Sequence, residues 1–333
     1  MAGSLHNWGE IFRTQNLSSE RAMDAVSRWL LITRASVIPV TLFSGAIGVL
    51  LAARSEDPHW FYAILALLGL VAAHAASNMI NDYFDLESGV DRDEYARMRY
   101  APHPVLSGLI SKKGLLLAIA GVLLLALGML LFLTEARAWP VAAFALTGLF
   151  VVVFYAAPPL KLERRGLGEP GVLLVWGPLM TGGTYYVTTG VLPPWVLVAS
   201  LPYALLVTVV VMGSHIDKFD ADSAIHVRTL PVLLGRERAL FLTQEVMVGF
   251  FVLLLCLVLV GTFGVWTLLS FLAMPSLLRA LRIYNRPRPE SAPPDSPEWP
   301  LWYVVWAFRL ARNAGGLLVI GLLLDAIYPL RLE

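Results

Sequence analysis

The sequence has little cysteine, little net charge and no recognisable secretory leader. Cys256 is the single cysteine among 333 residues, so no disulfide can form within the chain. The net charge of +1 gives no argument for nucleic-acid binding. The first 28 residues lack the short apolar core and small-residue cleavage site of a signal peptide. We expect residues 1–28 to form a cytoplasmic amphipathic leader that lies on the membrane surface.

The low charge content sets the class of protein. Charged residues make up 15% of the chain and hydrophobic residues 57%, with a mean hydropathy of +0.68, whereas soluble domains are about a quarter charged. Apolar runs long enough to cross a hydrocarbon core of about 30 Å recur along the chain. We count nine, at about 29–53, 59–81, 113–133, 140–157, 169–190, 195–215, 239–260, 263–281 and 303–327. The sequence therefore predicts an all-α, multi-span membrane protein with about nine transmembrane helices around a central cavity.

Basic residues alternate between successive connections. Those at 83–113, 158–168, 216–238 and 282–299 each hold three or more Lys or Arg, whereas the alternate connections hold Arg54, Arg137 or none. Positively charged loops remain on the cytoplasmic side. We therefore expect a multi-pass protein of the cell (inner) membrane, with its N-terminus and the residue 83–113 and 216–238 loops in the cytoplasm.

A coarse repeat divides the apolar part of the chain. The second and sixth spans end in acidic clusters, and the fourth and eighth end in basic, proline-rich segments. This period predicts one domain over 29–328, made of two four-helix halves and a ninth helix that together surround one site. Transporters also carry internal repeats, so the period by itself does not name a function.

The first acidic cluster continues a polar stripe along the second span. His74, Asn78, Asn81, Asp82 and Asp85 share one helical face, and an apolar helix turns such a face toward the bundle interior. For His74 and Asn78, interhelical hydrogen bonding and substrate binding both remain open. Asp82, Asp85 and the following Asp91 do not have EF-hand spacing. They form either a metal site or a solvated acidic turn.

A second acidic cluster ends the sixth span on the same predicted side of the membrane. It contains Asp217, Asp220 and Asp222. Carboxylates gathered at helix ends repel one another unless a cation lies between them, and Mg²⁺ is commonly held by one or two carboxylates plus substrate phosphates. Arg34 within the first span and Lys161 after the fourth supply positive charge suited to a diphosphate. Snorkelling of Arg34 to the interface is the alternative.

These motifs resemble the UbiA superfamily of membrane prenyltransferases over residues 28–330. Asn81-Asp82-Tyr83-Phe84-Asp85 with Gly89 and Asp91 resembles its first aspartate-rich motif, in a form closest to the branch that prenylates 1,4-dihydroxy-2-naphthoate. The cluster at 215–222, followed by Arg228-Thr229-Leu230-Pro231-Val232-Leu233-Leu234-Gly235, resembles the second motif. Tyr155–Lys161 with Gly166–Glu169 resembles the stretch between helices 4 and 5, and Arg34 matches an arginine of the first helix.

Two positions depart from the family pattern. Lys218 stands where the first aspartate of an Asp-x-x-x-Asp motif is expected, with Asp222 as the second. Asp217 or Asp220 then takes over the ligand role, or Lys218 replaces part of a metal's charge. His103 stands where an Arg-Pro-Leu-x-Ser-Gly segment has arginine. These departures bear on the subfamily and leave the superfamily unchanged.

The resemblance implies intramembrane transfer of an isoprenoid chain from an allylic diphosphate to an aromatic acceptor, as in quinone synthesis of the menaquinone type. It implies Mg²⁺ as cofactor, and an isoprenyl diphosphate, an aromatic acceptor and the lipid bilayer as partners. It assigns catalysis to Asp85, Asp91, Asp217 and Asp222. Metal binding falls to Asp82, Asp85, Asp91, Asp217, Asp220 and Asp222. Diphosphate binding falls to Arg34, Asn78, Asn81, Lys161 and Lys218.

The residue pattern also has to be compared with those of other classes of membrane protein. The resemblance also allows prenyl transfer to a non-quinone acceptor, of the chlorophyllide, haem or glyceryl lipid type. A cation-coupled transporter would carry its ionisable groups near the membrane midplane, whereas these carboxylates lie at helix ends. The Asp-x-x-Asp-Gly-x-x-Ala-Arg pattern of CDP-alcohol phosphotransferases is not present. The sequence indicates no oligomeric state.

Overall fold

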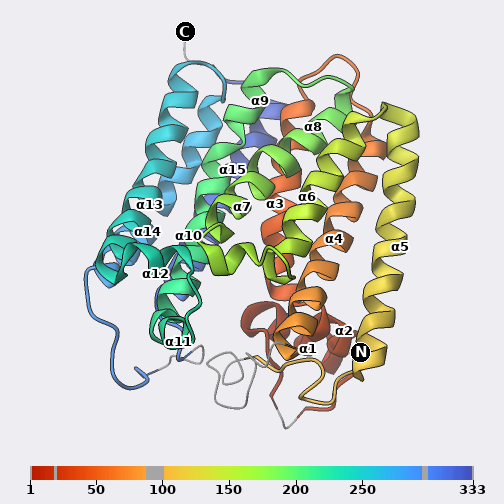
Figure 1. The fold of residues 1–333 in the computed structure, drawn as a ribbon. Coiled ribbons are helices and arrows are strands. Elements are labelled where there is room, and N and C mark those ends of the chain that lie inside the picture. The colour runs from red at the N-terminus through yellow and green to blue at the C-terminus, as the bar shows by residue number, and fades with distance from the viewer. Residues whose placement is uncertain (1, 19–20, 88–100, 295–298, 332–333) are drawn as a thin grey trace.

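The computed structural model describes residues 2–18, 21–87, 101–294 and 299–331, and the regular structure of these residues is helical throughout (Figure 1). In chain order the elements are α1 (Ala2–Thr14), α2 (Ala25–Ile32), η1 (Ala35–Val37), α3 (Ile38–Ala52), α4 (Trp60–Glu87), α5 (Lys112–Arg137), α6 (Pro140–Ala156), η3 (Leu162–Arg165), α7 (Gly168–Leu174), η4 (Val175–Leu179), α8 (Met180–Thr189), α9 (Pro194–Ala199), α10 (Leu201–Asp217), α11 (Phe219–Ala224), α12 (Leu230–Leu234), α13 (Arg236–Leu259), η5 (Val265–Ala273), α14 (Met274–Tyr284) and α15 (Tyr303–Ile327).

Seven helical stretches among the described residues are long and apolar enough to cross a membrane, so the fold is that of a multi-pass membrane protein. The predicted count of nine is not confirmed. The predicted span at 140–157 forms α6, which has only 17 residues. The predicted span at 169–190 forms the α7–η4–α8 run, which the π-helical segment η4 interrupts at Pro178. A proline inside a helix has no N–H to donate, so the regular α-helical hydrogen bonds are interrupted there by a wider π-helical turn.

The first predicted span, 29–53, is not one continuous helix. Helix α2 ends at Ile32, and Arg34 adopts a left-handed backbone conformation with φ 53° and ψ 54° before η1 and α3 begin. The carbonyl group of Thr33 would lose its helical partner at this break. Asn78 of α4 donates a hydrogen bond to it at 2.9 Å. The polar stripe of α4 thus stabilises a change of chain direction within the bundle.

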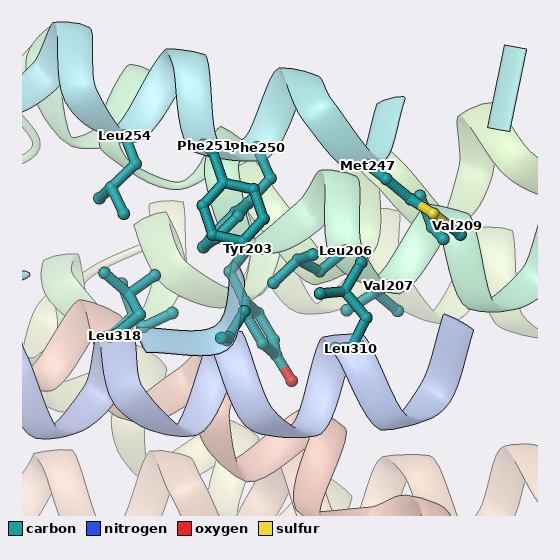
Figure 2. Packing of buried hydrophobic residues seen from close by; sticks show 14 of the residues in the cluster. Tyr203, Leu206, Val207, Val209, Met247, Phe250, Phe251, Leu254, Leu310 and Leu318 are labelled. Carbon is teal, nitrogen blue, oxygen red and sulfur yellow. The ribbon is translucent and has the colours of Figure 1, made fainter. Parts of the chain in front are cut away.

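The largest apolar core lies between α10, α13 and α15 (Figure 2). Tyr203 of α10 is 1% exposed, and its hydroxyl donates to the Val40 carbonyl of α3 at 3.1 Å.

Helix α5, in contrast to the core helices, has little contact with the rest of the protein. Only 11% of the residues in its most apolar stretch are buried, and the helix lies at the edge of the bundle (Figure 1). Leu117 and Leu124 are about two-thirds exposed. An apolar helix with so little protein contact is suited to lipid.

Helix α15 is fixed near both of its ends. Near its start, a Cβ on Gly213 of α10 would lie 2.9 Å from the Val304 Cα, so only glycine permits this close approach. Near its other end, fully buried Asp325 forms an ion pair with Arg54, which follows α3. Arg54 also donates through Nη1 to the Thr262 carbonyl at 3.1 Å. These contacts hold α15 against α10 and α3.

The residues of the predicted leader pack against the rest of the protein. Helix α1 contacts α2 and η1, and Ile11 is fully buried. Gln15, directly after α1, donates to the Leu31 carbonyl at 3.1 Å and accepts from the Ser36 hydroxyl at 2.5 Å. Helices α1, α2 and α11 gather at one end of the molecule, here called the α1 end, and the C-terminus lies at the opposite end (Figure 1).

Candidate active site

A cavity of about 850 Å³ opens among α1, α3, α4, α6, α7, α10, α11 and α15. Its charged lining residues include Asp85, Arg164, Lys218 and Asp222, which come from the C-terminal end of α4, from η3, and from the end of α10 with the adjoining α11. Apolar side chains from the interiors of the helices line the remainder, among them Phe43, Trp176 and Val210. The cavity therefore has a polar part and an apolar part, as required by a substrate with a charged head and a hydrocarbon tail.

The first acidic cluster divides between the cavity and the interior. Asn78, Asn81 and Asp85 line the cavity. Asp82 is fully buried, and its carboxylate pairs with the Arg34 guanidinium, which itself lines the cavity. Asp82 therefore stabilises the α2–α3 break through Arg34. Asp91 lies outside the described residues.

The second acidic cluster divides further. Asp222 is 4% exposed and lines the cavity. Asp217 instead points to the start of α15, where its carboxylate accepts hydrogen bonds from the backbone N–H groups of residues 302, 303 and 304 at 2.9–3.0 Å. Asp220 is a surface residue with 88% of its side chain exposed, and it pairs with Arg236 at 2.6 Å. Of the three, only Asp222 is a cavity residue.

The metal roles of Asp82, Asp217 and Asp220 stay predictions, and each of these carboxylates has a protein partner among the described residues. Asp82 balances the charge of Arg34, Asp217 binds the unpaired N–H groups that every helix start leaves, and Asp220 faces away from the cavity. Sequence spacing did not distinguish these carboxylates from Asp85 and Asp222, because all of them lie at or beyond the end of an apolar helix.

The basic residues also differ from the prediction at one position. Lys218 lines the cavity, with its ammonium 3.7 Å from a Glu163 carboxylate oxygen. Lys161 is a left-handed residue with φ 46° just before η3, and it does not line the cavity. Arg164, three residues later, lines it instead. The same basic segment thus contributes Arg164 to the cavity lining, after the tight turn at Lys161.

A buried histidine with two carboxylate partners lies beside the second cluster. The ring nitrogens of His215 lie 2.8 Å from a Glu169 oxygen and 3.0 Å from a Glu163 oxygen. Burial disfavours the charged form of Glu163, but the hydrogen bond from His215 and the charge of Lys218 lower the pKa of this residue to about 2. Both His215 and Glu169 lie in the segments that resemble family motifs, but the residue pattern predicts no role for either of them.

Asp222 lies in a different electrostatic setting. Burial raises the pKa of Asp222 above its usual range, and the charges of Lys218 and His215 oppose this shift. The Oδ2 atom of Asp222 is buried and has no hydrogen-bond partner among the described residues, and the same holds for Oδ1 of Asn81. Buried oxygens of this kind are suited to a hard cation.

Within residues 2–18, 21–87, 101–294 and 299–331, no three His, Cys, Asp or Glu side chains come together in a group that would hold a metal. Mg²⁺ does not require such a group, because it keeps several waters and binds one or two carboxylates together with substrate phosphates. The oxygens of Asn81, Asp85 and Asp222 therefore fit a magnesium–diphosphate complex better than a metal held by protein alone.

The two remaining histidines of interest make structural contacts. His74 Nδ1 lies 2.6 Å from the Thr41 hydroxyl, so this histidine joins α4 to α3. His103 Nδ1 accepts from the backbone N–H groups of residues 105 and 106, so its Nε2 donates to the Asp82 carbonyl at 3.2 Å. The histidine that replaces the family's arginine thus attaches the 103–110 loop to α4.

Comparisons with known proteins bear on the family and the fold of the chain. A family model described as the UbiA prenyltransferase family matches residues 41–295. The 1,4-dihydroxy-2-naphthoate octaprenyltransferase of Escherichia coli (strain K12) is 25% identical over 80% of this chain and 88% of its own, and that of Bacillus subtilis (strain 168) is 24% identical over 74% and 77%. A structure of a UbiA homolog from Archaeoglobus fulgidus, bound to GPP and Mg2+, has a TM-score of 0.61 and 17% identity over 87% of this chain and 99% of that one.

Proposed function

The chain belongs to the UbiA prenyltransferase family, and from that premise we propose that it transfers an isoprenoid chain from an allylic diphosphate to an aromatic acceptor of the 1,4-dihydroxy-2-naphthoate type. The observation that carries this proposal is the single cavity in which Asp85, Asp222, Arg34 and Lys218 meet a long apolar lining. The relatives named as 1,4-dihydroxy-2-naphthoate octaprenyltransferases support a quinone-type acceptor.

We propose Mg²⁺ as the cofactor, held by Asp85, Asp91, Asp222 and Asn81. Support comes from the unpartnered buried oxygens of Asp222 and Asn81 and from the related structure bound to GPP and Mg2+. The metal, when bound, supplies positive charge that stabilises the departing diphosphate. Asp82, Asp217 and Asp220 are left out of this metal set because each has a different partner.

The protein's own side chains would bind the rest of the diphosphate. Arg34, Arg164 and Lys218 line the cavity beside the acidic residues, and they can donate to phosphate oxygens. The C–O bond of the donor then breaks, and pyrophosphate leaves with the electron pair. The electron-rich ring forms a new C–C bond to the allylic cation and loses a proton or a carboxyl group as carbon dioxide.

The apolar lining would protect the cation from water. Trp176, Tyr155 and Tyr203 line the cavity, and aromatic faces stabilise a nearby cation. Trp176 is held in place because its indole N–H donates to the Thr41 hydroxyl at 3.1 Å. Excluding water from this region prevents hydrolysis of the reactive intermediate. The nearby aromatic residues Phe154, Tyr185 and Tyr186 do not line the cavity.

We further propose that the α1 end of the bundle faces the cytoplasm of a cell (inner) membrane. The proposal follows from the basic residues in the connections at this end. It would place the acidic residues where Mg²⁺ and a soluble aromatic acid are available.

The test uses the purified chain in lipid nanodiscs with a labelled isoprenyl diphosphate. The acceptors are dihydroxynaphthoate, hydroxybenzoate, homogentisate and glyceryl lipids. We expect product and pyrophosphate to form in equal amounts, only with an acceptor and Mg²⁺ present, and EDTA to stop the reaction reversibly. Ion flux in sealed vesicles, with an intact donor and no product across the panel, would favour a transporter instead.

A further inference from the structure

Two arginines lie on the cavity face of α15, inside a span predicted to be apolar. Arg309 and Arg312 both line the cavity, at helical spacing i and i+3. They share a row with Val305, and the adjacent row on the same face is Val304, Phe308 and Ala311. Charged residues on a membrane-spanning helix are costly and mark functional sites by default.

The position of these arginines along α15 places them within the bundle. Arg312 lies nine residues beyond Tyr303, or about 13 Å along the helix axis. One turn further on, a Cβ on Gly315 would meet the Tyr203 ring at 2.4 Å, so α15 packs closely on α10 beyond this point. Arg312 therefore lies where this wall of the cavity ends.

Among the described residues, no acidic side chain forms an ion pair with Arg312. The Arg312 side chain is exposed to the cavity. Arg309 has its guanidinium carbon 4.8 Å from the centre of the Trp306 ring, an arrangement that orients it. The cavity's own carboxylates, Asp85, Glu163 and Asp222, come from α4, η3 and α11 and not from α15.

We propose that Arg309 and Arg312 bind the carboxylate of an aromatic acid acceptor. A guanidinium presents donors in a planar fork that matches a carboxylate. The Val304–Phe308–Ala311 row beside it offers an apolar surface to the ring of the acceptor. The subsite rests on the proposed prenyl transfer and adds to it the part of the acceptor that is recognised. The diphosphate head is assigned to other elements of the cavity, at Asp85 of α4 and Asp222 of α11.

The test compares two acceptors that differ only in this carboxylate. Dihydroxynaphthoate and 1,4-dihydroxynaphthalene are given to the wild type, Arg312→Gln and Arg312→Lys, with Mg²⁺ and saturating donor under reducing conditions. We expect Arg312→Gln to raise the KM for dihydroxynaphthoate about tenfold or more, as for loss of a hydrogen bond to a charged group. The KM for 1,4-dihydroxynaphthalene and both kcat values should remain near those of the wild type, and Arg312→Lys should recover part of the loss.

Arg279→Gln is the matched control, because Arg279 is an exposed arginine of α14 that does not line the cavity. It should change neither KM. Equal KM shifts for both acceptors in Arg312→Gln, or no shift, would overturn the subsite and leave prenyl transfer intact. A rise in the KM for the donor would assign Arg312 to the diphosphate and also overturn it. A wild type that prenylates neither acceptor would overturn the proposed function itself.

Discussion

The two acidic clusters resemble each other in sequence and differ in what they do. In the first, Asp82 is buried against Arg34, and Asp85 lines the cavity. In the second, Asp217 binds the start of α15, Asp222 lines the cavity, and Asp220 lies on the surface. Each cluster thus contains one carboxylate that holds the bundle together and one that lines the cavity.

This difference shows why position at a helix end is not enough to assign a metal ligand. A carboxylate at the end of a buried helix can bind a cation, an arginine or the N–H groups of another helix, and all three stabilise its charge. Which of them it binds depends on the element that packs opposite. For Asp217 that element is α15, about 85 residues later in the chain.

The comparison is tested most directly at the two cavity carboxylates. Asp85→Asn and Asp222→Asn keep the side-chain size and remove the charge. We expect each to lower the rate of prenyl transfer by about a thousandfold or more, because charge stabilisation of the leaving diphosphate is lost. Initial rates with saturating donor and acceptor measure the effect, and thermal unfolding in detergent should remain close to that of the wild type. Full activity in either variant would contradict the metal assignment.

The buried partner of the first cluster should act mainly on stability. Asp82→Ala leaves the Arg34 guanidinium without its carboxylate, and we expect a loss of about 3 kcal/mol in the free energy of unfolding. The double variant Arg34→Met/Asp82→Leu should recover much of this stability. Denaturant titration of the purified proteins measures both. Equal stability of Asp82→Ala and the wild type would contradict a stabilising role for the Arg34–Asp82 ion pair.

Lys218, the unusual residue of the second cluster, is expected to contribute to donor binding. Lys218→Ala should weaken donor binding by about 1–3 kcal/mol, because hydrogen bonds to charged groups contribute this much. The KM for the isoprenyl diphosphate, or its Kd measured without acceptor, reports the change. Lys218→Asp should either restore the two-aspartate pattern of the family or impair binding more than alanine does. An unchanged Kd in Lys218→Ala would place this side chain outside the donor site.

The smallest effect is expected at Asp217. Asp217→Asn weakens the contact with the start of α15, and we expect a loss of about 1 kcal/mol of stability, as for helix N-caps. The dependence of the rate on Mg²⁺ concentration should not change, in contrast to Asp222→Asn. Thermal unfolding and a magnesium titration of the rate separate the two outcomes. A higher Mg²⁺ requirement in Asp217→Asn would return this residue to the metal set.

Much of the architecture was accessible from the sequence, because apolar runs and basic loops follow directly from the membrane environment. The polar stripe of α4 also predicted an inward face, and Asn78, Asn81 and Asp85 do line the cavity. The break at Arg34 was not predicted, since Leu31-Ile32-Thr33-Arg34-Ala35 contains neither glycine nor proline. Hydrogen bonds from α4, distant in sequence, stabilise it.

The two arginines of α15 could have been identified from the sequence. Arg309 and Arg312 lie in the ninth apolar run, and the rule that selected Arg34 as an intramembrane charge applies equally to them. The residue pattern does not indicate whether Lys161 or Arg164 lines the cavity. The choice depends on the left-handed backbone conformation of Lys161, just before η3. The separate roles of Asp217 and Asp222 depend on tertiary packing, which the residue pattern does not contain.

The fixation of α15 has a consequence for motion. Asp217 holds one end of this helix, and the Arg54–Asp325 pair holds the other. A helix held at both ends cannot slide or tilt without breaking buried polar contacts, so we expect it to remain stationary through the catalytic cycle. Any movement that admits or releases substrates would then involve the other elements around the cavity. Helix α1, which Gln15 joins to residues 31 and 36, is one of the shorter elements that line the cavity.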